Sequence, residues 1–184
     1  MDHYIEIRLL PDPEFSATLL MEALFAKLHR VLAGTAQGRV GVSFPAAGIT
    51  LGDRLRLHGS LAALTELDAL PWRKGLRDNT GHSGILSVPL QVKHRIVRRV
   101  QFKSNAERLR RRSVKKGWLS KEEAQIRIPF AKEQRSSLPF IRMKSTSSEQ
   151  SFQLFIEQGE IVDNAASGHF SAYGLSSQAT IPWF

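Results

Sequence analysis

The sequence predicts an α+β protein, with a small N-terminal domain and a C-terminal α/β domain that carries an arginine-rich helix. Three observations lead to this expectation. Strand-like and helix-like periodicities alternate in the first half of the chain, most of the positive charge follows in one stretch, and strand-like segments close the sequence. With 184 residues, 42% of them hydrophobic and 23% charged, the chain has the composition of a globular protein that buries a core.

The first half reads as a series of short elements. Residues 3–9 alternate between apolar and polar side chains, which predicts a strand. From Ser16 to Leu32 leucines recur at helical spacing, which predicts a helix ended by Gly34. The later elements are strands at Arg39–Phe44 and Arg54–His58, a helix at Ser60–Leu70, a loop at Asn79–Gly84 and a strand at Ile85–Val92. This order is that of a ferredoxin-like domain over residues 1–92.

The second half, residues 93–184, begins with an extended segment at Arg95–Phe102. A capping box at Ser104–Glu107 then predicts a basic helix over Asn105–Lys116, ended by Gly117. A second capping box at Ser120–Glu123 starts a helix that stops before Pro129. The remaining elements are strands at Phe140–Met143, Phe152–Glu157, Glu160–Val162 and Ile181–Phe184.

The charge distribution points to a polyphosphate partner. The chain carries a net charge of +9, and the stretch from Lys93 to Lys116 holds eleven Lys and Arg against the single acid Glu107. The other residues hold 15 bases and 16 acids, so the stretch accounts for all of the excess. Charge concentrated in this way is typical of nucleic-acid-binding proteins.

Within the basic helix, the cations gather on one face. Arg108, Arg111, Arg112 and Lys115 recur at three- and four-residue spacing, with Lys116 beside them. A solvated charged face is the alternative reading, but acids do not intersperse these cations after Glu107. Charge alone leaves the partner open between an RNA hairpin and B-form DNA.

Upstream of this helix, Arg99 and Gln101 lie two residues apart on an extended segment and are expected to point the same way. Arginine can bind guanine and glutamine can bind adenine, each with two hydrogen bonds, although both residues are equally compatible with an ordinary surface.

The candidate chemistry rests on histidine. The absence of cysteine excludes disulfides, thiolate metal sites and cysteine nucleophiles, and fits a reducing cytoplasm. No metal-ligand spacing and no glycine-rich phosphate loop is found. Of six histidines, His29 is placed at the edge of the apolar face of the first helix, where a packing role is the alternative. A nuclease built on this sequence is therefore expected to work without a metal or other cofactor, with histidine as general base.

Several motifs together resemble a known family closely and almost from end to end: the type I-F CRISPR repeat endoribonucleases (the Csy-four, or Cas-six-f, family). They are MDHY-x-EIRL-x-PDPEF at the N-terminus, LHR at Leu28–Arg30, GVSFP at Gly41–Pro45, RVQ-x-KSN-x-ERLRRR at Arg99–Arg112, LS-x-EEA…RIP ending at Pro129, F-x-LFI at Phe152–Ile156, and YGLS…PWF at the C-terminus.

The resemblance implies a metal-independent cut at the base of the repeat hairpin. His29 would be the general base that deprotonates a ribose 2′-hydroxyl, leaving a 2′,3′-cyclic phosphate and a 5′-hydroxyl. Tyr173 would orient the histidine or the ribose. A serine would hold the 2′-hydroxyl; an ungapped count from Phe152 places it at Ser145, with Ser147 as the second assignment and Ser148 close by.

The resemblance also implies which residues hold the RNA. The arginine-rich helix would enter the major groove of the hairpin, Arg99 and Gln101 would read bases near the foot of the stem, and Phe152 would stack on the terminal base pair. The RNA-binding set is Arg99, Gln101, Asn105, Arg108, Arg111, Arg112, Lys115, Lys116 and Phe152. Two departures from the family are the pair Lys115–Lys116, where arginines are common, and Gly117; lysine keeps charge but loses bidentate geometry.

The expected partners are the repeat hairpin or crRNA and other subunits of the type I-F crRNA surveillance complex. A non-cleaving crRNA-binding subunit is the nearest alternative, and a regulator that binds duplex DNA is a more distant one. The first ten residues do not resemble a signal peptide, and no apolar run approaches the about 18 residues of a membrane span, so a soluble, cytoplasmic protein without a membrane partner is expected.

Overall fold

The structure is a computed structural model, and it describes residues 1–36, 38–101, 106–128, 137–145 and 149–184. By its contacts the chain forms two compact units. The first comprises Met1–Val100 and Leu138–Phe184 and contains two antiparallel sheets; the second comprises Gln101–Ser137 and contains two helices.

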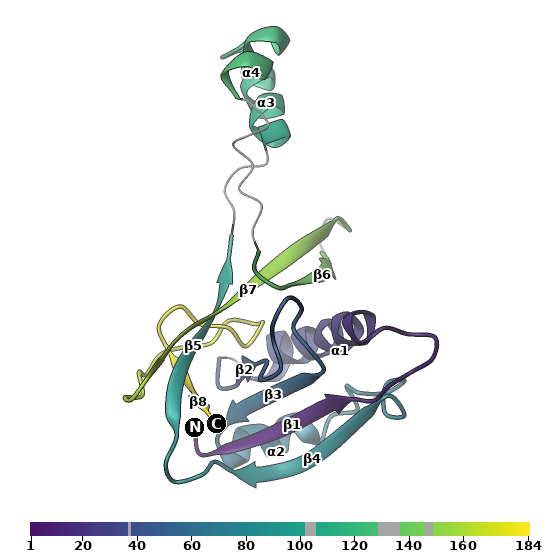
Figure 1. The fold of residues 1–184 in the computed structure, drawn as a ribbon, viewed down its shortest axis with the longest axis vertical. Coiled ribbons are helices and arrows are strands. Elements are labelled where there is room, and N and C mark those ends of the chain that lie inside the picture. The colour runs from purple at the N-terminus through teal and green to yellow at the C-terminus, as the bar shows by residue number, and fades with distance from the viewer. Residues whose placement is uncertain (37, 102–105, 129–136, 146–148) are drawn as a thin grey trace. The chain divides into compact units, whose positions relative to one another are not determined.

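The first sheet has the ferredoxin-like order that the sequence predicts. Its strands are arranged β2-β3-β1-β4, all antiparallel neighbours, with the two helices packed on the sheet (Figure 1). The α+β fold class is therefore confirmed. The elements are β1 (His3–Leu9), α1 (Ala17–Val31), β2 (Gly41–Ser43), β3 (Arg54–Gly59), α2 (Leu61–Asp68) and β4 (Thr80–Ser87).

Local sequence signals explain both helices. Ser16 and Ser60 are the N-caps of α1 and α2, and each side-chain oxygen accepts a hydrogen bond from a backbone N–H three residues on, at 3.3 Å. Leu20, Leu24 and Leu28 are buried on one stripe of α1, against the buried face of β1.

Two boundaries differ from the sequence prediction. Gly34 does not end the first helix, because α1 passes into a π-helical turn, Leu32–Ala36, that contains it. Asn79–Gly84 is not a loop: β4 begins at Thr80 and ends at Ser87, five residues earlier than the predicted strand at both ends. Pairing with β1 stabilises this polar, glycine-containing segment, and the Ser83 hydroxyl accepts from the Glu6 N–H at 2.9 Å where the register shifts.

The second sheet has the order β6-β7-β5-β8, formed by β5 (Lys93–Val100), β6 (Phe140–Lys144), β7 (Ser151–Val162) and β8 (Thr180–Trp183). The two predicted strands at Phe152–Glu157 and Glu160–Val162 are one continuous strand, β7, that passes through Gln158 and Gly159. Its first part, Ser151–Phe155, pairs with β6, and its second part, Phe155–Val162, pairs with β5, with a register shift between Arg95 and Val97.

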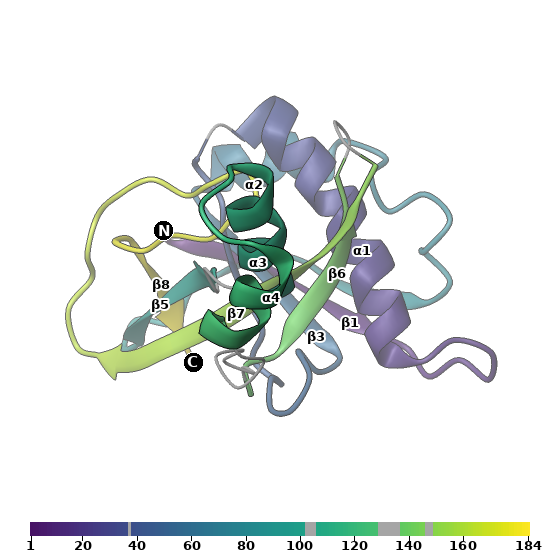
Figure 2. The same ribbon diagram turned by 90° about the horizontal axis from the view of Figure 1, so that it is seen from above.

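The two sheets share one core. The Gln158 side chain bonds to both backbone groups of Phe44, donating to its carbonyl at 3.1 Å and accepting from its N–H at 3.3 Å. Strand β6 lies beside α1 (Figure 2), and Ile141, Leu154 and Ile181 join the core of the first sheet. The strands before residue 92 form the first sheet and those from residue 93 form the second, which agrees with the predicted boundary. The first compact unit contains both sheets, however, so a separate domain over 93–184 stays a prediction.

The second unit contains α3 (Ala106–Lys115) and α4 (Lys121–Arg127). The predicted capping box of α4 is present: Glu123 N–H donates to Ser120 Oγ at 3.1 Å, and Ser120 N–H donates to Glu123 Oε2 at 2.9 Å. The capping box proposed at Ser104–Glu107 begins outside the described residues.

Candidate active site and basic helix

His29 lies in the last turn of α1, half-buried, directly after the buried Leu28. Two groups on the turn Ser171–Gly174 fix its ring. The Ala172 carbonyl oxygen is 2.9 Å from Nδ1, and the Tyr173 ring stacks on the imidazole with 4.2 Å between centroids and 9° between planes. The hydrogen bond and the stack together define both the tilt and the rotation of the ring.

The partner of Nδ1 determines which nitrogen can act as a base. A carbonyl oxygen can only accept a hydrogen bond, so Nδ1 carries the hydrogen and donates it to Ala172. A neutral imidazole has one N–H, and its lone pair is therefore on Nε2. This tautomer gives His29 an acceptor nitrogen on the side of the ring away from the turn.

The turn itself is anchored by β2. Gly174 has a φ of +69°, and its carbonyl accepts from the Val42 N–H at 2.8 Å. A Cβ at this position would lie 2.3 Å from a Val42 methyl carbon, so only glycine fits. The close approach of the turn to β2 thus positions Ala172 and Tyr173 over the end of α1.

Arg99 joins this group from β5. Its guanidinium carbon lies 5.7 Å from the ring centroid of Tyr173 and 5.7 Å from that of Phe152 on β7. Arg99 is exposed and Phe152 is half-buried. Four residues that the sequence singled out, from α1, β5, β7 and the C-terminal turn, are therefore brought together.

Ser145 follows the last residue of β6, at the start of the connection to β7. Its N–H donates to the Gln150 carbonyl at 2.9 Å, and its side chain is half-buried. Ser147 and Ser148 lie outside the described residues, so the choice among the three serines stays a prediction.

The cations of α3 are sorted by their surroundings. Arg111, Arg112, Lys115 and Lys116 are exposed, whereas Arg110, Ser113 and Val114 are half-buried. Arg110 Nε donates to the Ile128 carbonyl, the C-cap of α4, at 2.8 Å. Arg110 thus ties α3 to α4, whereas Arg112, Lys115 and Lys116 of the predicted cationic face are exposed. Asn105 and the side chain of Arg108 lie outside the described residues, and Gln101 is the exposed first residue of this unit.

Some cations of the basic stretch Lys93–Lys116 form ion pairs within the protein, which the sequence analysis did not predict. In the first part of the stretch, on β5, Lys93 pairs with Asp163, and Arg98 pairs with Glu157 at 2.9 Å. The Lys93 ammonium lowers the pKa of the Asp163 carboxyl through its hydrogen bond and charge. Glu157 lies on the neighbouring β7 and Asp163 directly follows it. Both acids are more than 50 residues along the chain from their partners, so a local charge count does not find them.

A second histidine, on β3, lies in the protein core. His58 on β3 is fully buried, and its Nε2 lies 2.8 Å from Ser43 Oγ. Burial, and to a smaller extent the nearby Arg56 charge, together lower the pKa of His58 to about 3. His58 therefore stays neutral in the folded protein at ordinary pH.

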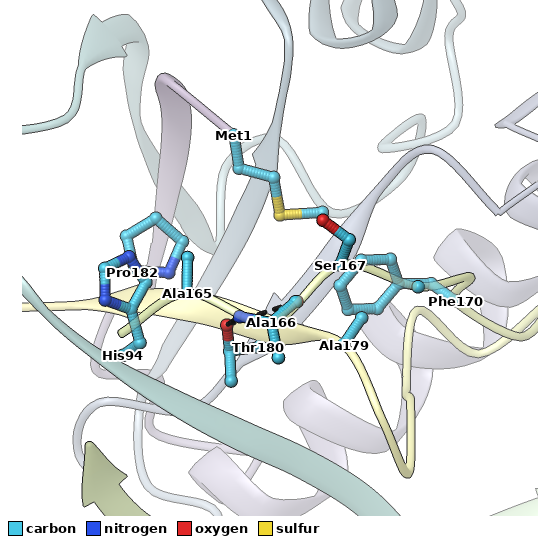
Figure 3. A pocket seen from close by; sticks show the side chains of 10 residues that line it. Met1, His94, Ala165, Ala166, Ser167, Phe170, Ala179, Thr180 and Pro182 are labelled. Atoms are coloured by element: carbon cyan, nitrogen blue, oxygen red, sulfur yellow. Dashed lines mark hydrogen bonds between the residues drawn. The ribbon is translucent and has the colours of Figure 1, made fainter. Parts of the chain in front are cut away.

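A hollow of about 270 Å³ lies elsewhere in the first unit, lined mainly by the segment before β8 together with Met1 and His94 (Figure 3). Its wall is braced by Thr180 Oγ1, which accepts from the Ala166 N–H at 2.9 Å. Of the predicted site residues that the structure describes, none lines it.

Among the described residues, no group of three or more His, Asp and Glu side chains has the arrangement of a metal site. No helix within the residues that the structure describes has the length and apolar character needed to cross a bilayer.

Comparison with known proteins gives consistent matches over the whole chain. Residues 4–184 match the model of the family described as CRISPR-associated protein (Cas_Csy4). A protein of Escherichia coli (strain UTI89 / UPEC), named CRISPR-associated endonuclease Cas6/Csy4, is 58% identical over 184 residues. A protein of the same name from Pseudomonas aeruginosa (strain UCBPP-PA14) is 46% identical over 187 residues. Each alignment covers 100% of both chains.

Proposed function

The chain belongs to the Cas_Csy4 family of CRISPR-associated proteins, and from this premise we propose that it is an endoribonuclease that binds a CRISPR repeat hairpin and cuts at its base. The observation that carries the proposal is the arrangement of His29, which has Nδ1 bound to the Ala172 carbonyl and its ring stacked on Tyr173. It presents a free base nitrogen in a fixed orientation.

The proposed reaction needs one proton acceptor at the start. His29 Nε2 takes the proton of a ribose 2′-hydroxyl, and the 2′-oxygen forms a bond to the adjacent phosphorus. The bond from phosphorus to the 5′-oxygen breaks, and the leaving oxygen takes up a proton from water. The protonated His29 then gives its proton to the hydroxide that remains, which restores the neutral base. The products are a 2′,3′-cyclic phosphate and a 5′-hydroxyl. Tyr173 holds the imidazole plane, and Ser145, or Ser147 as the second assignment, positions the 2′-hydroxyl.

Residues beside this base are proposed to place the foot of the hairpin. The guanidinium carbon of Arg99 lies 5.7 Å from the ring centroids of both Phe152 and Tyr173. In this position Arg99 is suited to bind a guanine edge, and Gln101 is suited to bind an adenine edge. Phe152 offers a ring for the terminal base pair. The exposed cations of α3, with Asn105 and Arg108, contact the phosphates of the stem.

Slow product release is expected because the residues proposed to hold the stem are not those proposed to cut the RNA. Cutting one bond at the foot of the stem leaves the phosphate contacts of α3 unchanged, so the product hairpin is expected to stay bound. We propose that the protein then enters a crRNA surveillance complex together with the processed RNA.

The test is cleavage of a labelled repeat hairpin in EDTA, with binding measured in parallel. His29→Ala is expected to lower the cleavage rate by about 10²- to 10⁴-fold with nearly unchanged affinity. A substrate with a 2′-deoxy residue at the cut site should bind and remain intact. His169→Ala, which removes an exposed histidine outside the site, should cut like the wild type.

Other results would point elsewhere. Tight hairpin binding without cleavage by the wild type would favour the non-cleaving crRNA-binding subunit. Cleavage that stops in EDTA would contradict the metal-independent reaction. Binding of duplex DNA at least as tight as that of the hairpin would favour a DNA-binding regulator.

A further inference from the structure

Trp118 follows the glycine that ends α3, and a helix cap fixes its backbone. Gly117 has a φ of +70°. The Gly117 N–H donates to the Val114 carbonyl at 3.0 Å, and the Trp118 N–H donates to the Ser113 carbonyl at 2.9 Å. This pair of bonds is a Schellman motif, which fixes the direction in which the chain leaves the helix.

The indole is exposed although its backbone is held. In a Schellman motif the residue at this position often packs an apolar side chain back on the helix. Trp118 instead is 63% exposed, whereas Trp72 in the first unit is 7% exposed. Its ring contacts a cation: Lys116 Nζ lies 5.2 Å from the ring centroid. The exposed indole therefore offers a large flat apolar face, with a cation beside it, to a partner.

The surroundings of the ring indicate the chemistry of that partner. The last turn of α3 and the residue after it present the exposed cations Arg112, Lys115 and Lys116. A ligand that satisfies both features combines negative charge with a flat apolar surface. A nucleotide has both, since its phosphate can contact the ammonium and its base can lie on the indole.

On this basis we propose that Trp118 is a base-stacking residue, which binds an unpaired base of the RNA held along α3, with Lys116 on a neighbouring phosphate. The inference rests on the proposed function. Bases inside a stem are already stacked on both faces, so the base that Trp118 binds comes from the loop of the hairpin or from a bulge. The contact adds affinity for hairpins whose unpaired base reaches the end of α3.

The test is equilibrium binding of a labelled hairpin, measured by fluorescence anisotropy. Trp118→Ala is expected to weaken binding by about 5- to 150-fold, the range for loss of one base–aromatic stack. Trp118→Phe, which keeps an aromatic ring, should lose less. The matched control is Ile126→Ala, which truncates a 79% exposed apolar residue on α4 and should change affinity by less than about twofold.

A set of hairpins with one loop base at a time replaced by an abasic residue identifies the contact. One such hairpin should bind the wild type as weakly as the intact hairpin binds Trp118→Ala, and the two changes together should weaken binding no further. Intact affinity of Trp118→Ala, as expected for a ring that contacts another protein, would overturn the proposal. So would abasic changes whose effects add to that of the variant. Both results leave the proposed function standing, whereas a wild type that binds no hairpin removes both.

Discussion

The buried His58 should make the stability of the first unit fall at acid pH. Its pKa of about 3 in the folded state, caused by burial and by Arg56, compares with about 6.5 in an unfolded chain. Below about pH 6.5 the unfolded chain therefore binds a proton that the folded protein does not. Stability is lost as the pH falls from about 6.5 toward 3, and the loss at pH 5 is about 2 kcal/mol relative to pH 8.

Urea unfolding at pH 8, 6 and 5 measures this effect. His58→Gln is the comparison, because its amide can reach Ser43 as Nε2 does but does not titrate. The difference in unfolding free energy between wild type and variant should change by about 2 kcal/mol from pH 8 to pH 5. An unchanged difference over this range would refute the reasoning.

Three further predictions concern the site and its supports. Tyr173→Leu removes the stack on His29 and should slow single-turnover cleavage by about 10- to 100-fold, while Tyr173→Phe should retain most of the rate. Lys115→Ala should weaken hairpin binding similarly for different stem sequences and lower the slope of log affinity against log salt by about 1. Ser16→Ala removes the N-cap of α1, and urea unfolding should show a loss of about 1 kcal/mol.

The sequence predicts elements best where the signal is local. The strand His3–Leu9 is observed with the same bounds, and the predicted capping box at Ser120–Glu123 is present. Alternation and capping depend on residues a few positions apart, so they can be recognised without knowledge of the fold. The polar start of β4 at Thr80 could not be recognised in this way, because its strand conformation depends on pairing with β1, more than 70 residues away.

The candidate site, too, could be predicted from the sequence only in part. Helical periodicity places His29 at the edge of the apolar face of the first helix, but its assignment as the base came from the family resemblance. The Ala172 carbonyl, which defines the tautomer, leaves no mark in a sequence because every residue carries a carbonyl. Gly174 is the one available signal, since a glycine directly after Tyr173 is typical of a tight turn.

The residues with proposed roles in cleavage and those with proposed roles in binding the stem belong to different compact units. His29, Tyr173, Arg99 and Phe152 belong to the first unit, whereas the exposed cations of α3 and Trp118 belong to the second. A change in one unit leaves the core of the other intact. Cation variants should therefore alter affinity, and with saturating protein they should leave the single-turnover rate near that of the wild type; His29 variants should do the reverse. Proportional loss of both quantities in both sets of variants would mean that the RNA contacts of α3 are needed to align the scissile phosphate, and that binding and chemistry are not separable in this protein.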